Sequence, residues 1–152
     1  MSLKTAATLN AIESHLLATG MFLRVNTHEP KNAPDTRLTA SIIVDSINPV
    51  QSSGLASTSA VVLYQVRLYL GMINEPQDGI DPSLMVAVDT VFTALSADFE
   101  LGGNARNVDL LGMAGQGGLS ATSGYVTVGS TMYRIMDISC PVIMNDAWSQ
   151  SP

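Results

Sequence analysis

The stretch STSAVVLYQVRLYLGMI, residues 57–73, decides the fold class of this chain. Every second residue in its middle is apolar, namely Val62, Tyr64, Val66, Leu68 and Leu70. Because alternate side chains of a strand point to the same side, this pattern predicts a long strand with one buried face. The opposite face carries Gln65 and Arg67 between apolar residues and is only half polar. We expect a second layer or a neighbouring molecule to cover part of it.

Further strands are predicted on both sides of this stretch. Residues 37–50 alternate in the same way, and residues 125–144 indicate a hairpin that turns near Gly129 and Ser130. Prolines, glycines and small polar residues mark the intervening loops. We expect two shorter strands at residues 21–27 and 105–111, loops at residues 28–36 and 51–57, and a polar end around Trp148.

Two helices are predicted from apolar residues spaced three and four apart. The first covers residues 3–19 and ends at Gly20; the second ends near Ser96 and begins with Asp81 as its cap and Pro82 in its first turn. Runs of strands with two segregated helices indicate an α+β fold. We therefore expect a mostly antiparallel or mixed sheet with both helices packed on one face. The single domain would span residues 1–148, with a polar tail at residues 149–152.

The most unusual feature of the composition is its low charge. Only 13% of the 152 residues are charged, about half the usual ~25% of globular proteins. Such a chain is expected to cover much of its surface with copies of itself, although a monomer with a Ser, Thr, Asn and Gln surface remains an alternative. The net charge of −6 disfavours sequence-specific nucleic-acid binding and a membrane surface. No apolar stretch is expected to span a bilayer, and the single cysteine, Cys140, is expected to be buried.

The glycine-rich segment at residues 112–124 raises the possibility of a phosphate-binding loop. A Walker loop needs a lysine directly after its last glycine, but Leu119 and Ser120 follow Gly118 here. The segment also lacks the third glycine of a dinucleotide fingerprint, and the chain has no nucleophile-elbow motif. Two histidines, His15 and His28, and the Asp98/Glu100 pair fit surface roles better than metal or acid–base sites. The sequence therefore predicts no catalytic residue, no cofactor and no metal, and hence no enzyme.

Two stretches, DFELGGNARNVDLLG (98–112) and GYVTVGSTMYRIMDISCPVIMNDAW (124–148), carry a family resemblance. Together with the helix and strand plan before them, they resemble tail terminator (tail completion) proteins of long, non-contractile-tailed bacteriophages. The resemblance covers residues 1 to about 148 and rests on structural motifs. It implies a small α+β domain.

The resemblance implies a virion protein at the head–tail junction, assembled in the host cytoplasm. Six copies would form a ring that caps the tail tube, ends its polymerisation and joins the tail to the head connector. Partners would be other copies of the chain, the tail tube protein and a connector or head stopper protein, with DNA only passing through the lumen. A head–tail connector or other neck-ring component is an alternative, and a small-ligand binding domain is an alternative of another class.

Two sets of residues are candidates for this assembly. Arg67, Arg106 and Asp109 are expected to form ion pairs between subunits, with solvated surface roles as the alternative. The segment at residues 112–124 is expected to be a mobile loop that becomes ordered on a partner ring, and the loops at residues 28–36 and 51–57 are further candidate arms. The glycines of that loop are Gly112, Gly115, Gly117, Gly118 and Gly124.

Overall fold

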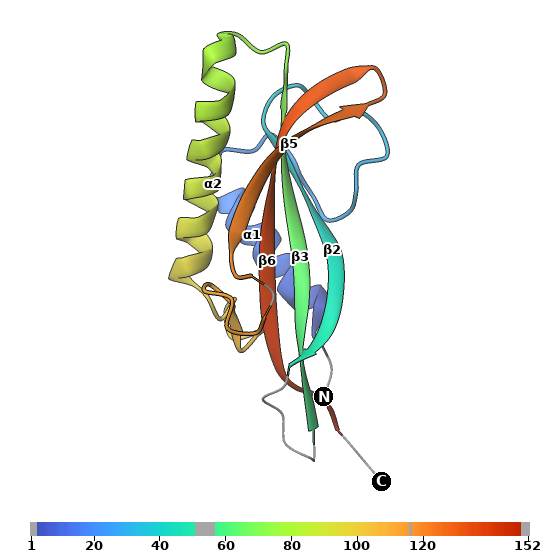
Figure 1. Ribbon diagram of the computed structural model, residues 1–152, viewed down its shortest axis with the longest axis vertical. Coiled ribbons are helices and arrows are strands. Elements are labelled where there is room, and N and C mark those ends of the chain that lie inside the picture. The colour runs from blue at the N-terminus through green and yellow to red at the C-terminus, as the bar shows by residue number, and fades with distance from the viewer. Residues whose placement is uncertain (1–2, 51–56, 116, 150–152) are drawn as a thin grey trace.

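The computed structural model describes residues 3–50, 57–115 and 117–149. Within these residues, two α-helices lie on one side of a six-stranded sheet, as expected for the α+β fold (Figure 1). The helices are α1 (Thr5–Ala18) and α2 (Ile80–Ala97), and a short 3-10 turn, η1 (Gln77–Gly79), leads into α2. The strands are β1 (Val25–Asn26), β2 (Thr39–Val50), β3 (Ser57–Gly71), β4 (Asn107–Val108), β5 (Ser120–Val128) and β6 (Thr131–Ser149).

The sheet is mixed, and its two longest strands lie at its centre. The strand order is β1-β2-β3-β6-β4, and β5 pairs with the first half of β6. β1 runs parallel to β2, whereas every other pair among the described strands is antiparallel. β3 and β6 pair along nearly their whole length, with Val66 opposite Ile138. The loop at residues 51–56 lies outside the described residues.

The predicted inner face of β3 is the centre of the core. Val62, Tyr64, Val66 and Leu68 are fully buried, and Leu70 is 8% exposed. Both helices pack on this face, and the buried Thr8 hydroxyl of α1 lies 2.8 Å from the Tyr64 hydroxyl. Ile12 and Leu16 of α1 and Leu84, Val91 and Leu95 of α2 complete this core.

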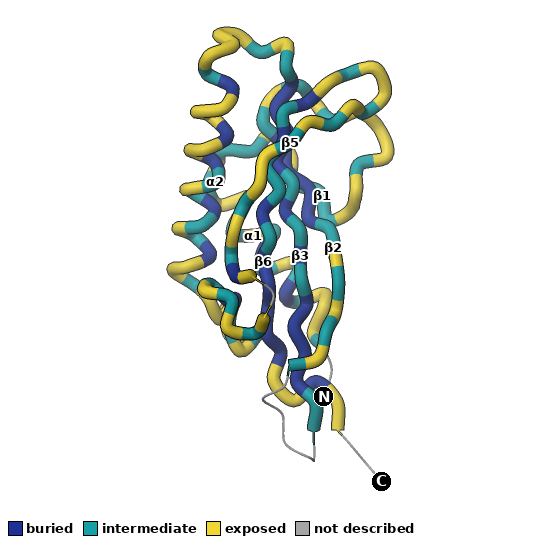
Figure 2. The backbone as a smooth tube through the Cα atoms, in the orientation of Figure 1, coloured by how far each residue is buried: buried dark blue, intermediate teal, exposed yellow. Residues whose placement is uncertain are grey.

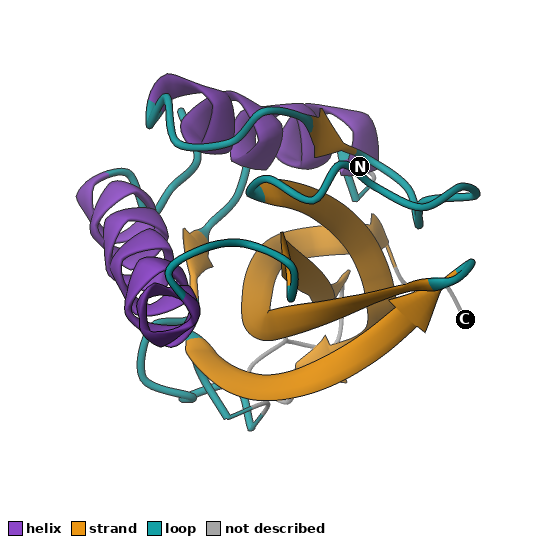
Figure 3. Cartoon of the chain, turned by 90° about the horizontal axis from the view of Figure 1, so that it is seen from above, coloured by secondary structure: helices purple, strands orange, loops and turns teal. Residues whose placement is uncertain are grey.

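The chain itself covers part of the other face of β3. Seen from above, the sheet is strongly curled, and the β5–β6 hairpin is part of this curl (Figure 3). Tyr69, Tyr133 and Ile135 form a second, smaller cluster there, and the two tyrosine rings meet edge to face with centroids 5.8 Å apart. This end of the face is therefore buried within the chain, while the expected covering layer stays a prediction for the rest of the face.

Three predicted segments differ from the structure, and the first is the strand expected at 21–27, which contains only the two residues of β1. The strand expected at 105–111 contains only the two residues of β4, because residues 98–106 are mostly turns. The polar end around Trp148 belongs to β6, where Trp148 lies opposite Thr58. Backbone pairing with β3 needs no apolar side chain, so a polar sequence can complete the sheet. The tail at residues 150–152 lies outside the described residues.

α2 is more apolar than its position at the surface requires. Gln77–Ala97 is long and apolar enough to cross a membrane by length and composition alone, contrary to the expectation that no stretch would be. Soluble core helices pass the same test, and one side of α2 packs on the sheet here. Buried and exposed residues alternate along α2, whereas β3 is buried along most of its length and β6 mainly in its middle (Figure 2).

Candidate functional site

The glycine-rich segment consists of two parts instead of one loop. Residues 120–128 form β5, in which Gly124 pairs with Ile135 of β6. Residues 109–115 form a compact turn, which we call the Asp109 turn. The expectation of one loop through residues 112–124 is therefore wrong for residues 120–124, which belong to β5, while its mobility in the free subunit stays a prediction.

Asp109 holds this turn together. Its side chain accepts three backbone hydrogen bonds, from Gly112 (3.0 Å), Met113 (2.9 Å) and Ala114 (2.8 Å). The residue is only 2% exposed. A carboxylate that is buried and bonded in this way serves its own chain, so the geometry gives Asp109 an intrachain role in place of the expected intersubunit ion pair.

Two of the candidate glycines are required by close backbone contact. Gly112 and Gly118 have φ angles of 84° and 78°. A Cβ atom on Gly118 would lie 2.7 Å from the Gly112 nitrogen and 2.9 Å from the Leu110 oxygen. Gly115 and Gly117 also have positive φ angles, but a Cβ atom there would meet no atom within 4 Å. The glycines therefore build a tight turn.

The Asp109 turn presents two apolar side chains to solvent. Leu111 is 86% exposed and Met113 is 88% exposed. The neighbouring Leu110 packs against the main core, which anchors the turn. The sequence analysis missed this feature because it took the glycines as a sign of a mobile loop. The signal that could have indicated the turn is Asp109, whose carboxylate can accept hydrogen bonds from the amides that follow it.

The two candidate arginines have different surroundings. Arg67 donates to Asp137 on the adjacent strand β6, with 2.7 Å between Nε and Oδ1 and a second contact of 3.2 Å. Its pKa is raised, first because of this hydrogen bond. Arg106 is exposed and makes a long contact of 3.4 Å to Asn145. Arg67 is thus engaged within the sheet, while the Arg106 guanidinium remains accessible.

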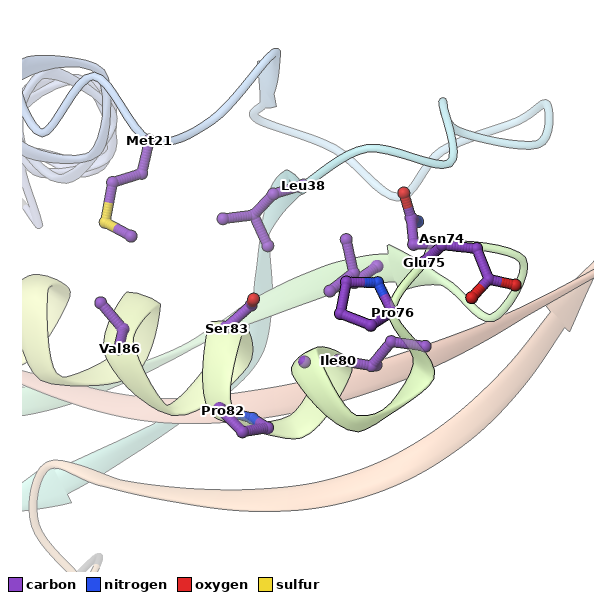
Figure 4. A pocket seen from close by; sticks show the side chains of 11 residues that line it. Met21, Leu38, Asn74, Glu75, Pro76, Ile80, Pro82, Ser83 and Val86 are labelled. Carbon is purple, nitrogen blue, oxygen red and sulfur yellow. The ribbon is translucent and has the colours of Figure 1, made fainter.

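A groove of about 570 Å³ lies at the start of α2 (Figure 4). Its wall comes from three parts of the chain: the α1–β1 connection, the residue just before β2, and the stretch that runs from the end of β3 through the following turn into the first turns of α2. The apolar lining is formed by Met21, Leu38, Leu70, Ile80, Pro82 and Val86. Asn74, Glu75 and Ser83 provide polar groups. No local sequence pattern indicates a groove of this kind, because tertiary contacts create it.

The β5–β6 hairpin is tied to the start of α2 beside this groove. Arg134 donates to Asp81 (2.9 Å) and to the carbonyl oxygen of Gly124 (3.2 Å), and its guanidinium lies 4.4 Å from the centre of the Tyr125 ring. Asp81 was expected to cap α2, but Gly79 occupies the cap position, so the helix start has no side-chain cap. The acidic side chain at the helix start therefore serves as a partner for Arg134.

The remaining candidate titratable groups form separate contacts. His15 Nε2 lies 2.9 Å from Asp98 Oδ2, which joins α1 to the end of α2, and His28 contacts the Glu29 carbonyl oxygen. Cys140 is buried, which raises its pKa to about 12. Among the residues that the structure describes, no group of three His, Cys, Asp or Glu side chains is placed to hold a metal ion.

No protein-family model matches this chain, and no curated protein matches it either.

Proposed function

We propose that this chain is a structural virion protein that forms a ring, with six copies as the expected number. The ring caps the phage tail tube, ends tube polymerisation and joins the tail to the head connector. The proposal starts from the family resemblance of residues 98–148 and from the low charge of the chain.

The observation that carries the proposal is the apolar character of the exposed surface. Large apolar side chains that are at least two-fifths exposed occur on both helices, on β2, on the hairpin and at the Asp109 turn. On α2, Met85 and Val86 are 64% and 56% exposed. No lysine or arginine occurs between Arg67 and Arg106. Neighbouring large apolar side chains that are left in solvent, such as Met85 and Val86, fit a surface that binds another protein.

A ring accounts for this surface economically. Its subunits meet through two different patches, head to tail, so each small subunit buries two of its sides. Two further faces would meet the tube protein and the connector or head stopper protein. The net charge of −6 agrees with a lumen through which DNA slides without specific binding.

The test is the mass and symmetry of the particle, alone and after mixing with isolated tail tubes. Native mass spectrometry should give one closed assembly, and electron microscopy should show one ring at one end of each tube. A chain that stays monomeric at high concentration and does not bind tail tubes would contradict the proposal. A ring that binds the connector but not the tube would favour the neck-ring alternative.

The groove at the start of α2 favours a second candidate, a small-ligand binding domain. Its volume of about 570 Å³ lies within the range of roughly 300–1,000 Å³ that is typical of ligand pockets. This candidate would be supported over the ring by a monomeric chain whose melting temperature rises when small apolar compounds are added. The Val86→Asp variant should then lose that rise.

A further inference from the structure

Two features near opposite ends of α2 are complementary in chemistry. One is the pair of exposed apolar side chains on the Asp109 turn, and the other is the apolar groove at the helix start. We propose that Leu111 and Met113 of one copy fill the groove of the next copy. This contact rests on the proposed ring, because it requires a second copy of the chain.

The projecting side of the contact is already ordered. Leu111 and Met113 are the two most exposed large apolar side chains among the described residues. The three hydrogen bonds to Asp109 fix the backbone that carries them. A binding element that is held in shape loses little conformational entropy on association, so its apolar burial contributes more fully to affinity.

The receiving side has suitable size and polarity. Removing one leucine side chain from a core opens a cavity of roughly 150 Å³; the groove, at about 570 Å³, therefore has room for two such side chains. Its wall includes Leu38, Ile80 and Val86. Residues 110–119 contain no ionisable side chain. Docking these residues beside Glu75 therefore removes no charge from water other than that of Glu75 itself.

The contact has to join different copies. α2 has 18 residues and so is about 27 Å long. The groove involves its first turns, while the chain reaches the Asp109 turn only after leaving its other end (Figure 1). Each copy thus offers one projection and one groove, which is the arrangement of a head-to-tail interface that can close into a ring.

Engineered cysteines test this contact directly. Ser83 lines the groove, so the double variant Ser83→Cys/Met113→Cys places one thiol on each side. Cys140 is buried and should not interfere. Mild oxidation should produce a ladder of covalent multimers on a non-reducing gel that stops at the number of copies in the ring. The matched control Thr93→Cys/Met113→Cys, with its thiol two turns beyond the groove on α2, should give no ladder.

The outcomes separate the contact from the ring itself. If the native chain forms a ring but Ser83→Cys/Met113→Cys gives no ladder, the contact is overturned and the ring stands. If the native chain is monomeric at high concentration, the proposed ring is overturned. A ladder without an upper limit would support the contact and contradict a closed ring.

A charge variant gives a second, independent measurement. Met113→Asp should raise the concentration at which the assembly dissociates by at least about tenfold, since a carboxylate would face the apolar groove and Glu75. Adding Glu75→Lys should recover part of that loss. Met113 is 88% exposed, so the melting temperature of the dissociated subunit should not change. An unaltered dissociation concentration in Met113→Asp would overturn the contact.

Discussion

At the scale of single residues, Asp109 shows how one side chain organises a segment. Its buried carboxylate accepts hydrogen bonds from three successive amides, Gly112, Met113 and Ala114. The same arrangement keeps Leu111 and Met113 in solvent. The residue that looked like a surface charge is therefore the support for the most exposed apolar side chains that the structure describes.

Replacing Asp109 should release the turn. In Asp109→Ala the three amides lose their acceptor, which should lower the free energy of unfolding by about 1–3 kcal/mol. Asp109→Asn should cost less, since its one oxygen can still accept while its NH₂ group opposes Ala114. Urea unfolding measures the loss, with Asp89→Asn on the exposed side of α2 as control. Equal stability of Asp109→Ala and the native chain would contradict this role.

Gly115 in the Asp109 turn and Gly118 just after it should respond differently to alanine. Gly115→Ala introduces only the strain of a positive φ angle, about 1–2 kcal/mol. Gly118→Ala adds a collision with the backbone of Gly112 and Leu110, so it should be clearly more destabilising. Thermal unfolding of the two variants tests this order, and a reversed order would show that the turn is open at Gly118.

At the scale of elements, α2 is attached to the rest of the fold at both ends. Arg134 of β6 holds its start through Asp81, and His15 of α1 holds its end through Asp98. Between these two contacts, α2 buries only one stripe against the sheet. The attachments therefore define how the exposed side of α2 is presented to a neighbour.

Arg134→Gln should loosen the hairpin from α2. The variant loses both bonds to Asp81 and the position of the guanidinium beside Tyr125. We expect a loss of about 1 kcal/mol, with much of it from the aromatic contact. Asp81→Asn should cost less, because the Asp81 carboxylate is 61% exposed and exposed ion pairs contribute little. Comparing the two variants by urea unfolding checks this, and a larger loss in Asp81→Asn would contradict it.

The attachment at the other end of α2 should depend on pH. The Gly102 amide, and after it His15, lower the pKa of Asp98 below its ordinary value of 3.8. A lowered pKa in the folded chain gives stability that is present above the unfolded value and is lost as the pH falls through the folded value.

Asp98→Asn should therefore be less stable than the native chain at neutral pH, and the difference should shrink in acid. Urea unfolding midpoints of both chains, measured from neutral pH down through the titration of the carboxylate, provide the comparison. A difference that stays constant over this range would show that the Asp98 charge adds nothing to stability.

At the scale of the whole molecule, the interface chemistry makes a prediction about salt. At 1 M salt the Debye screening length falls to about 3 Å, which weakens exposed ion pairs but leaves apolar contacts intact. A ring held by Leu111, Met113 and the groove should keep its mass from low salt to about 1 M NaCl, as measured by light scattering. Dissociation at high salt would instead favour ion pairs between subunits, with Arg106 as the accessible candidate.

The sequence by itself determined the α+β class, the long strand β3 to within two residues of its end, the hairpin turn at Gly129 and the buried stripe of α2. These follow from periodicity and local turn chemistry, which short stretches of chain express on their own. Gly129 has a φ angle of +64° as the first of two turn residues, in keeping with this chemistry.

Only the tertiary structure decided the Asp109 turn, the groove and the strand character of residues 145–149. Each of these depends on groups that are distant in sequence or on backbone hydrogen bonds that no side-chain pattern records. The amides of the Asp109 turn meet their acceptor, and the groove gains its lining, only once the fold has brought these segments together.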